Sequence, residues 1–94
     1  MLFAIICHDK ENSSAVRMEN RPAHLDYIGG YKDKAYAIGP MLSDDGEGMI
    51  GSLLIMDFAD KAEAESFAAG DPYNQAGLFE SVTIAPWKKV IPAD

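Results

Sequence analysis

The order strand, helix, strand, strand, helix, strand predicts an α+β sandwich for these 94 residues. Apolar runs of strand length alternate with segments that carry helix-capping and helix-spacing signals, and this alternation gives the order. Two interleaved strand–helix–strand units of this kind form the ferredoxin-like fold, a four-stranded antiparallel sheet with its helices on one face. We expect one domain over residues 1–94, because single domains span about 50 to 250 residues.

The first strand is predicted over residues 2–7, a continuous apolar run that is followed by polar residues. It contains Cys7, the only cysteine of the chain, so no disulfide can form within one molecule. We expect Cys7 to be a small core residue, because reactive thiols need an accessible, electropositive setting. A single cysteine and an opening run too short for a membrane span or a signal sequence favour the cytoplasm.

Two helical segments are expected next. Asn12, Ser13 and Ser14 offer capping side chains for a helix that starts at Ala15. Proline lacks the amide hydrogen that a helix interior needs, so we expect a break near residue 20. A second helix then has Pro22 in its first turn and ends at residues 29–30, a pair of glycines.

The second half of the chain repeats the strand and helix signals. Asp60 followed by Glu63 resembles a capping box and opens a helix that Gly70 ends in a left-handed conformation. A short helical turn is expected after Asp71, which precedes a proline. The strands are expected over residues 35–41, residues 51–58 and from Phe79 through Ala85, where the last one alternates with period two.

The charge balance argues against nucleic acid as a partner. Fifteen acidic residues against eight basic ones give a net charge of −7, which repels phosphate backbones. The glycines match no phosphate-cradling pattern, so no nucleotide cofactor is expected. Two histidines without a compact ligand motif give no metal-site prediction. No cofactor, nucleic-acid partner or membrane partner is therefore expected.

The open face of the predicted sheet suggests a second copy of the chain. The first and third strands are apolar on both faces, whereas a strand with one solvated face shows polar alternation. The helices cover one face only, so another surface must cover the other. We expect a homodimer in which two sheets pack face to face.

Several short segments together carry a family resemblance. In order along the chain, they are Met1-Leu2-Phe3-Ala4-Ile5-Ile6 followed by Asp9, Arg21-Pro22-Ala23-His24-Leu25, Ala37-Ile38-Gly39-Pro40-Met41, Gly51-Ser52, Asp71-Pro72-Tyr73, Ala76-Gly77-Leu78-Phe79 and Pro86-Trp87-Lys88-Lys89-Val90. With this order and spacing the chain resembles the YciI-like (YCII-related) family of the dimeric α/β-barrel group. The resemblance implies a ferredoxin-like homodimer whose active site is centred on a histidine and an aspartate. The family's activity is mostly undefined, and proposals for it include elimination of HCl from chlorinated hydroquinones.

Carried over residue by residue, the resemblance implies that His24 and Asp71 are the catalytic pair and that Ser52 is a pocket neighbour. Tyr73 either lines the pocket or packs at the dimer contact, and Arg21 either binds an anionic substrate or faces solvent. Both alternatives stay open at this point. A small molecule is the expected ligand.

The chemistry expected of the pair is general acid/base catalysis, with His24 moving a proton and Asp71 orienting the ring. The expected reaction is elimination or isomerisation of a small cyclic or aromatic compound. A place early in a helix would favour the neutral ring of His24. Each residue also has a structural interpretation, since a histidine can be satisfied by a backbone carbonyl and an aspartate before proline often caps a turn. The alternative function is therefore a binding or accessory domain without catalysis, or a purely structural protein.

His8 and Asp9 follow the first strand and add one imidazole and one carboxylate. On an extended segment, adjacent side chains point to opposite faces. As a pair they carry little weight as a functional site.

Overall fold

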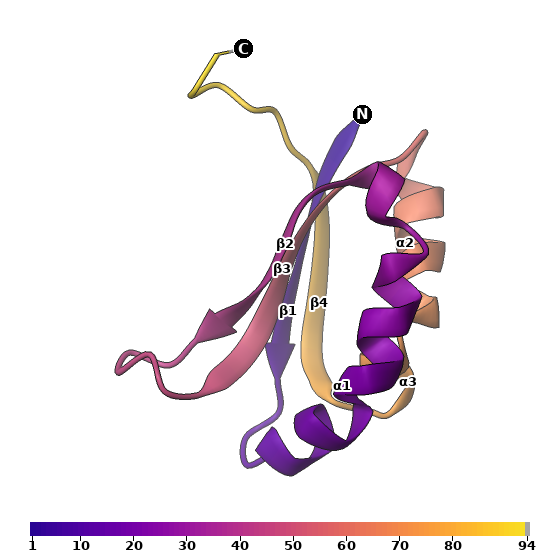
Figure 1. Cartoon of the computed structure of the whole chain (residues 1–94). Coiled ribbons are helices and arrows are strands. Elements are labelled where there is room, and N and C mark those ends of the chain that lie inside the picture. Colours follow the sequence, from indigo (N-terminus) through magenta and orange to yellow (C-terminus); the bar gives the residue numbers. More distant parts are fainter. Residues whose placement is uncertain (94) are drawn as a thin grey trace.

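The computed structural model describes residues 1–93, and its element order confirms the predicted α+β arrangement. The elements are β1 (Leu2–Asp9), α1 (Ser14–Gly29), a 3-10 helix (Lys32–Lys34), β2 (Ala35–Leu42), β3 (Met49–Asp57), α2 (Lys61–Gly70), α3 (Pro72–Gln75) and β4 (Phe79–Pro86). The four strands form one antiparallel sheet in the order β2-β3-β1-β4. This is the ferredoxin-like topology, and Figure 1 shows α1 and α2 on the same side of the sheet.

The core lies between the sheet and the two long helices. Phe3 and Ile5 of β1 and Leu54 and Met56 of β3 alternate toward the helices and are almost fully buried. On the helix side, Phe67 of α2 packs against them, and the remaining core residues are Cys7, Phe58, Ala64 and Ala68. Cys7 is 2% exposed, which confirms its expected place in the core.

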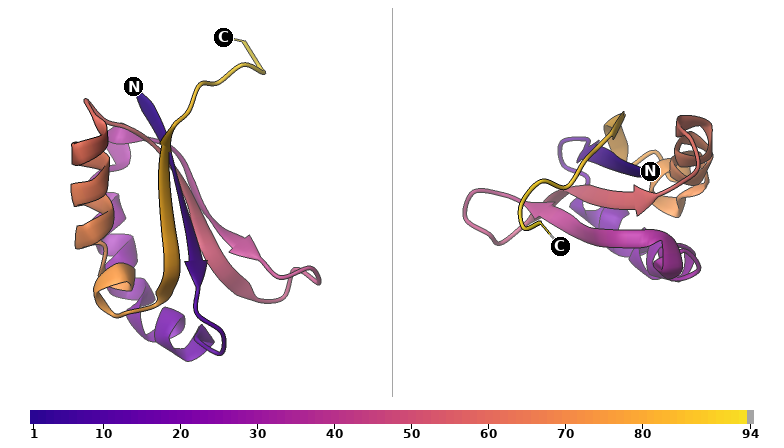
Figure 2. Two further views of the ribbon diagram at one scale, coloured as in Figure 1. Left: turned by 180° about the vertical axis from the view of Figure 1, so that it is seen from behind. Right: turned by 90° about the horizontal axis from the view of Figure 1, so that it is seen from above.

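The open face, which we define as the sheet face turned away from the helices, is apolar along the middle of β1 and β3. The strand register places Ala4 and Ile6 of β1 beside Leu53 and Ile55 of β3 on this face. Leu53 is 38% exposed and counts among the exposed large apolar side chains of the described residues. The left view in Figure 2 shows the two long helices packed on the opposite side of the sheet.

The predicted break in the first helix is wrong. One continuous helix, α1, runs from Ser14 to Gly29 with Pro22 inside it. The side-chain amide of Asn20 donates to the Val16 carbonyl at 2.9 Å, which gives that helical oxygen a side-chain donor. The ribbon of α1 bends along its course in Figure 1, as expected for a helix that contains proline. Pro22 therefore bends this helix instead of starting a new one.

The expected caps are only partly confirmed. Asp60 caps α2 by accepting a hydrogen bond from the Glu63 amide at 2.9 Å, as predicted. Ser13 occupies the cap position of α1, but its side chain makes no capping hydrogen bond and donates to the Glu11 carbonyl instead.

The third strand begins two residues before the predicted Gly51, at Met49, and ends at Asp57 instead of residue 58.

The expected left-handed conformation of Gly70 is also wrong. Gly70 is the last residue of α2, and the glycines with positive φ in residues 1–93 are Gly46 and Gly77. A Cβ atom on Gly70 would lie 2.6 Å from the Tyr27 hydroxyl oxygen. Glycine is therefore needed here because α1 approaches closely through Tyr27, which donates to the Phe67 carbonyl at 2.9 Å.

Candidate active site

The structure brings together the two residues expected to form a pair. The Nδ1 atom of His24, on α1, lies 2.8 Å from the Oδ1 atom of Asp71, which precedes α3. Both side chains are buried. A carboxylate can only accept, so Nδ1 carries the hydrogen and Nε2 is the free basic nitrogen of the ring.

Asp71 also has the structural role that its place before proline predicted. The same Oδ1 atom accepts the backbone amide of Tyr73 at 2.9 Å and so caps α3, with Pro72 in the first turn. The carboxylate of Asp71 is thus held by two donors, the backbone amide at the start of α3 and the imidazole of His24. Asp71 therefore holds the ring of His24 in one orientation.

Tyr73 stacks on the imidazole ring. The ring centroids of Tyr73 and His24 are 3.9 Å apart and the planes differ by 12°. Burial raises the pKa of the Tyr73 hydroxyl, and the positive charges of Arg17 and Arg21 partly oppose this rise. The hydroxyl therefore stays protonated at neutral pH.

Arg17 of α1 is a site residue that the sequence interpretation missed. It is 3% exposed and forms a paired ion contact with Asp9, with Nε to Oδ2 at 2.7 Å and Nη2 to Oδ1 at 2.9 Å. Nη2 also donates to the Ser52 hydroxyl at 3.0 Å, and the guanidinium carbon lies 4.6 Å from the centre of the Tyr73 ring. Burial alone would lower the pKa of Arg17, but the hydrogen bonds and charge of Asp9 outweigh it and raise the pKa above its ordinary value.

Helical spacing is the signal that would have revealed Arg17. Arg17, Arg21, His24 and Ile28 lie at positions i, i+4, i+7 and i+11, which share one face of a continuous helix. The expected break near residue 20 divided this face between two helices. The same error placed His24 early in a helix, whereas it lies in the second half of α1, so the predicted favourable effect of the helix start does not apply.

These side chains surround a small pocket between α1 and the β2–β3 side of the sheet, with a volume of about 240 Å³. Tyr73 therefore lines the pocket, and Arg21 is exposed at its edge. Asp71 is not among the residues that line it and contacts His24 through Nδ1. The lining residues are Arg17, Arg21, His24, Leu25, Ile28, Ile38, Gly39, Pro40, Met49, Ser52 and Tyr73.

The free nitrogen of His24 can reach this pocket. Among the described residues, no buried side-chain nitrogen or oxygen lacks a hydrogen-bond partner. The His24 hydrogen bond uses Nδ1, so Nε2 must have accessible surface, and His24 lines this pocket. Nε2 is thus available to a bound molecule.

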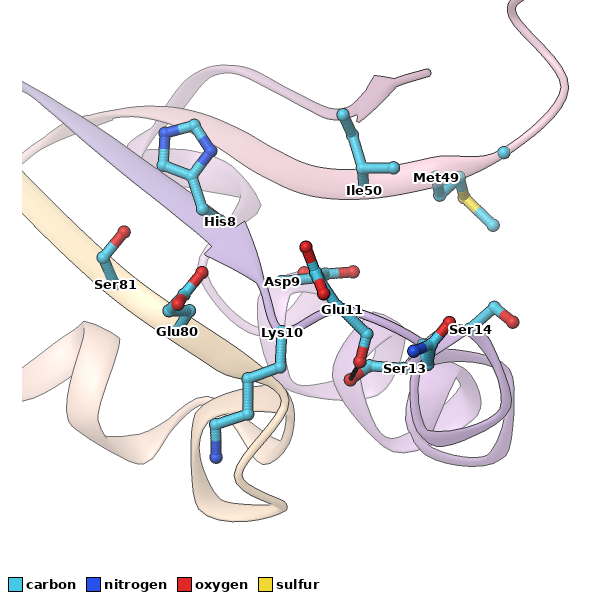
Figure 3. Close-up of a pocket in the computed structure, with 12 residues that line it drawn as sticks. His8, Asp9, Lys10, Glu11, Ser13, Ser14, Met49, Ile50, Glu80 and Ser81 are labelled. Atoms are coloured by element: carbon cyan, nitrogen blue, oxygen red, sulfur yellow. Dashed lines mark hydrogen bonds between the residues drawn. The ribbon is translucent and has the colours of Figure 1, made fainter.

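A second, larger hollow of about 650 Å³ lies on the other side of Asp9. Figure 3 shows the carboxylates of Asp9 and Glu11 in its middle, with Met49 and Ile50 on one side and His8 on the other. His8 is exposed and turned away from the Arg17 contact, so the expectation that His8 and Asp9 point apart is confirmed. Asp9 alone joins the network around Arg17.

The side chains of residues 1–93 include no group of three or more His, Cys, Asp or Glu that could hold a metal ion. In the same part of the chain, no helix has the length and hydropathy needed to cross a membrane.

Comparison with known proteins identifies relatives over nearly the whole chain. The "Protein YciI" of Escherichia coli O6:H1 is 36% identical over 97 residues, covering 96% of this chain and 99% of that protein. An "Uncharacterized protein" of Haemophilus influenzae is 31% identical with the same coverage.

Two solved structures are similar. One is 5-chloro-2-hydroxyhydroquinone dehydrochlorinase (TftG) from Burkholderia phenoliruptrix AC1100 in complex with 2,5-dihydroxybenzoquinone, with a TM-score of 0.90, 38% identity and full coverage of both chains. The other, an antibiotic biosynthesis monooxygenase, is 12% identical with a TM-score of 0.57 over 96% of this chain and 99% of that chain, a similarity of fold alone. The profile of the YCII-related domain matches residues 1–88. The chain therefore belongs to the YCII-related family.

Proposed function

We propose that this protein is a small enzyme that eliminates a leaving group from a substituted hydroquinone or a similar ring by acid/base catalysis. The observation that carries the proposal is the 2.8 Å contact between His24 and Asp71, with Nε2 of His24 open to the pocket of about 240 Å³. The 38% identity to a dehydrochlorinase that acts on a chlorinated hydroxyhydroquinone supports this reaction class.

The pocket has the size and polarity for one ring. A cavity of about 150 Å³ is enough for benzene, so 240 Å³ accommodates a ring with a few oxygen or chlorine substituents. Ile28, Ile38 and Pro40 supply apolar walls, and Ser52 and His24 supply polar contacts.

Elimination of HCl from such a ring is a sequence of proton movements. One hydroxyl proton moves to the carbon that carries chlorine, a second hydroxyl proton is removed, and chloride leaves with the bonding electrons of the carbon–chlorine bond. A hydroxyquinone remains, and the balance needs no external oxidant. Nε2 of His24 accepts and returns protons, while the carboxylate of Asp71 stabilises the imidazolium that forms.

Turnover of 5-chloro-2-hydroxyhydroquinone by the His24→Gln variant tests the proposal. The wild type should release chloride, and the variant should be at least about 100-fold slower because general acid/base catalysis contributes factors of that order. Thermal unfolding and ligand binding of the variant are the control. Equal rates in both proteins would overturn the role of His24. Binding of the substrate by the wild type without chloride release would favour the alternative of a binding domain.

We further propose that the working protein is a homodimer that packs through the open face. Ala4 and Ile6 of β1 and Leu53 and Ile55 of β3 form an apolar surface there. A lysine in place of Leu53 should convert the dimer to a monomer in light scattering coupled to size-exclusion chromatography, whereas Lys61→Gln on α2 should not. A monomeric wild type would contradict the proposal.

A further inference from the structure

We propose that Met49 determines the size of the molecule that the His24 pocket accepts, because its side chain closes this pocket against the second hollow. The substrate class is then a single ring that carries no bulky substituent. The inference rests on the proposed function, since it sets the size limit of the substrate at the same site.

Met49 lies at the boundary of two cavities. The His24 pocket has a volume of about 240 Å³ and the second hollow has one of about 650 Å³. Within residues 1–93, Met49 is the one residue that lines both of them. Figure 3 shows Met49 at the β3 edge of the second hollow, next to Ile50. The two cavities therefore approach each other at this side chain.

The strand pairing leaves space beside Met49. β1 pairs with β3 as far as His8, which lies opposite Gly51, and the chain then turns away toward α1. Met49 and Ile50 belong to the part of β3 that extends beyond this point, where Met49 pairs with Leu42 of β2 on the other side. The second hollow lies where the pairing of β1 with β3 has ended.

Another part of the boundary is rigid. Asp9 lines the second hollow and Arg17 lines the pocket, and Nε and Nη2 of Arg17 lie 2.7 Å and 2.9 Å from the carboxylate oxygens of Asp9. Both side chains are almost fully buried, and a buried ion pair is costly to break. Methionine is unbranched and adapts to its neighbours. Met49 is therefore the part of the boundary that a substitution can open without leaving a buried charge unpaired.

The backbone before Met49 is held in place by the turn between β2 and β3. The Ser43 amide donates to the Gly48 carbonyl at 2.8 Å, and the Gly48 amide donates to the Ser43 hydroxyl at 3.0 Å. These bonds do not involve the Met49 side chain. A shorter side chain at this position should therefore remove volume from the boundary and leave the course of β3 unchanged.

The volumes give the expected size limit. A cavity of about 150 Å³ holds benzene, so two linked rings need about 300 Å³, which is more than the pocket of about 240 Å³ offers. With a small side chain at position 49, the second ring would extend into the hollow of about 650 Å³.

Two quinones of different size test the proposal by calorimetry. 2,5-Dihydroxybenzoquinone is the single ring, and its 3-benzyl derivative carries a second ring on a flexible methylene group. The wild type should bind the single ring at least about tenfold more tightly, since a misfit of one methylene group in an apolar pocket is already worth about 10- to 200-fold. Equal affinities of the wild type for the two compounds would overturn the proposal.

The Met49→Ala variant tests the residue itself. The ratio of its affinities, benzyl derivative over single ring, should rise at least about tenfold above the wild-type ratio. The ratio is the readout because general damage to the pocket weakens both compounds and leaves the ratio unchanged. An unchanged ratio would overturn the role of Met49.

Three further variants serve as controls. Met49→Leu nearly keeps the side-chain volume and should keep the wild-type ratio. Met18→Ala, at an exposed position of α1, should keep it as well. If thermal unfolding shows that Met49→Ala does not fold, Met49→Val takes its place and should shift the ratio in the same direction. A rise of the ratio in Met18→Ala as large as that at position 49 would also overturn the proposal.

The outcome can be separated from that of the proposed function, because binding is measured without turnover. A wild type that prefers the single ring, with the preference lost in Met49→Ala, but releases no chloride from its substrate would overturn the proposed function alone. A wild type that releases chloride, with an unchanged ratio in Met49→Ala, would overturn the assignment of Met49 alone.

Discussion

The Oδ1 atom of Asp71 accepts two hydrogen bonds at once, from Nδ1 of His24 at 2.8 Å and from the Tyr73 amide at 2.9 Å. The first bond orients the ring that lines the pocket, and the second begins α3. One oxygen atom thus serves both the proposed chemistry and the local fold, and substitutions at Asp71 can separate these two roles.

Asp71→Asn should reduce turnover far more than stability. Asparagine caps helices about as well as aspartate and still offers an oxygen to the Tyr73 amide, but it carries no charge to stabilise an imidazolium. We expect a loss of at least about 100-fold in kcat on a chlorinated hydroxyhydroquinone and a change in unfolding free energy below about 1 kcal/mol. Asp71→Ala is the matched comparison, since it should lose both properties. Wild-type kcat in the Asn variant would contradict the orienting role.

Ser52→Ala should destabilise the protein through Arg17. The Ser52 hydroxyl is buried and accepts from Nη2 of Arg17 at 3.0 Å, so its removal leaves one N–H of Nη2 without an acceptor while Asp9 still accepts from the same nitrogen. Leaving such a group unpaired costs about 1 to 3 kcal/mol in unfolding free energy, measurable by urea denaturation. Ser66→Ala on the exposed surface of α2 is the control and should cost less than about 0.5 kcal/mol. Equal stability of both variants would show that the hydrogen bond contributes nothing.

Gly70→Ala should lower the melting temperature because the new methyl group would meet the Tyr27 hydroxyl at 2.6 Å. Crowding of this kind costs about 1 to 3 kcal/mol. In a Tyr27→Phe background the hydroxyl is absent, and the penalty of Gly70→Ala should shrink. Gly29→Ala is the control, because a Cβ atom there meets nothing within 4 Å. A Gly70→Ala protein as stable as the wild type would contradict the close approach of α1 to α2.

Cys7 should resist alkylation in the folded protein. Burial, followed by the charges of Asp71 and Asp9, raises the pKa of its thiol to about 12. The thiolate is the reactive form, so iodoacetamide near pH 8 should modify Cys7 only when the chain unfolds, a rate that mass spectrometry can follow. Modification as fast as that of a free thiol would show that the site opens readily.

The raised pKa of the Cys7 thiol also makes the unfolding free energy of the protein depend on pH. The folded pKa of Cys7 lies above its value of about 8.5 in an unfolded chain, so the unfolded state ionises first as the pH rises. The wild type should therefore lose stability between about pH 8.5 and 12 relative to Cys7→Ala, which has no thiol. Parallel stability curves for the two proteins over this range would contradict the raised pKa.

The fold was predictable because its signals are local. The apolar run of β1 and the Asp60–Glu63 capping pattern of α2 each depend on neighbouring residues, and both were interpreted correctly. The conformation of Gly70 was not predictable, because its reason is Tyr27, a residue on another helix. Pro22 misled the interpretation, since the tertiary structure holds a bent helix where local preference favours two shorter ones.

The site was predictable in part. The contact of His24 with Asp71 was expected from the family resemblance and not from their separation of 47 positions. Arg17 and Asp9 gave no local signal as a pair, because the ion contact joins a strand end to a helix and needs both in place. The single observation that would have placed Arg17 beside His24 was the unbroken face of α1.

The double use of the Asp71 oxygen affects how other members of this family should be compared. A family member without the proposed activity still needs a cap for α3, so selection for folding alone can retain the carboxylate. Its presence in a homologue is therefore weak evidence for chemistry. The imidazole at the position of His24 is the better marker of a member with the proposed activity.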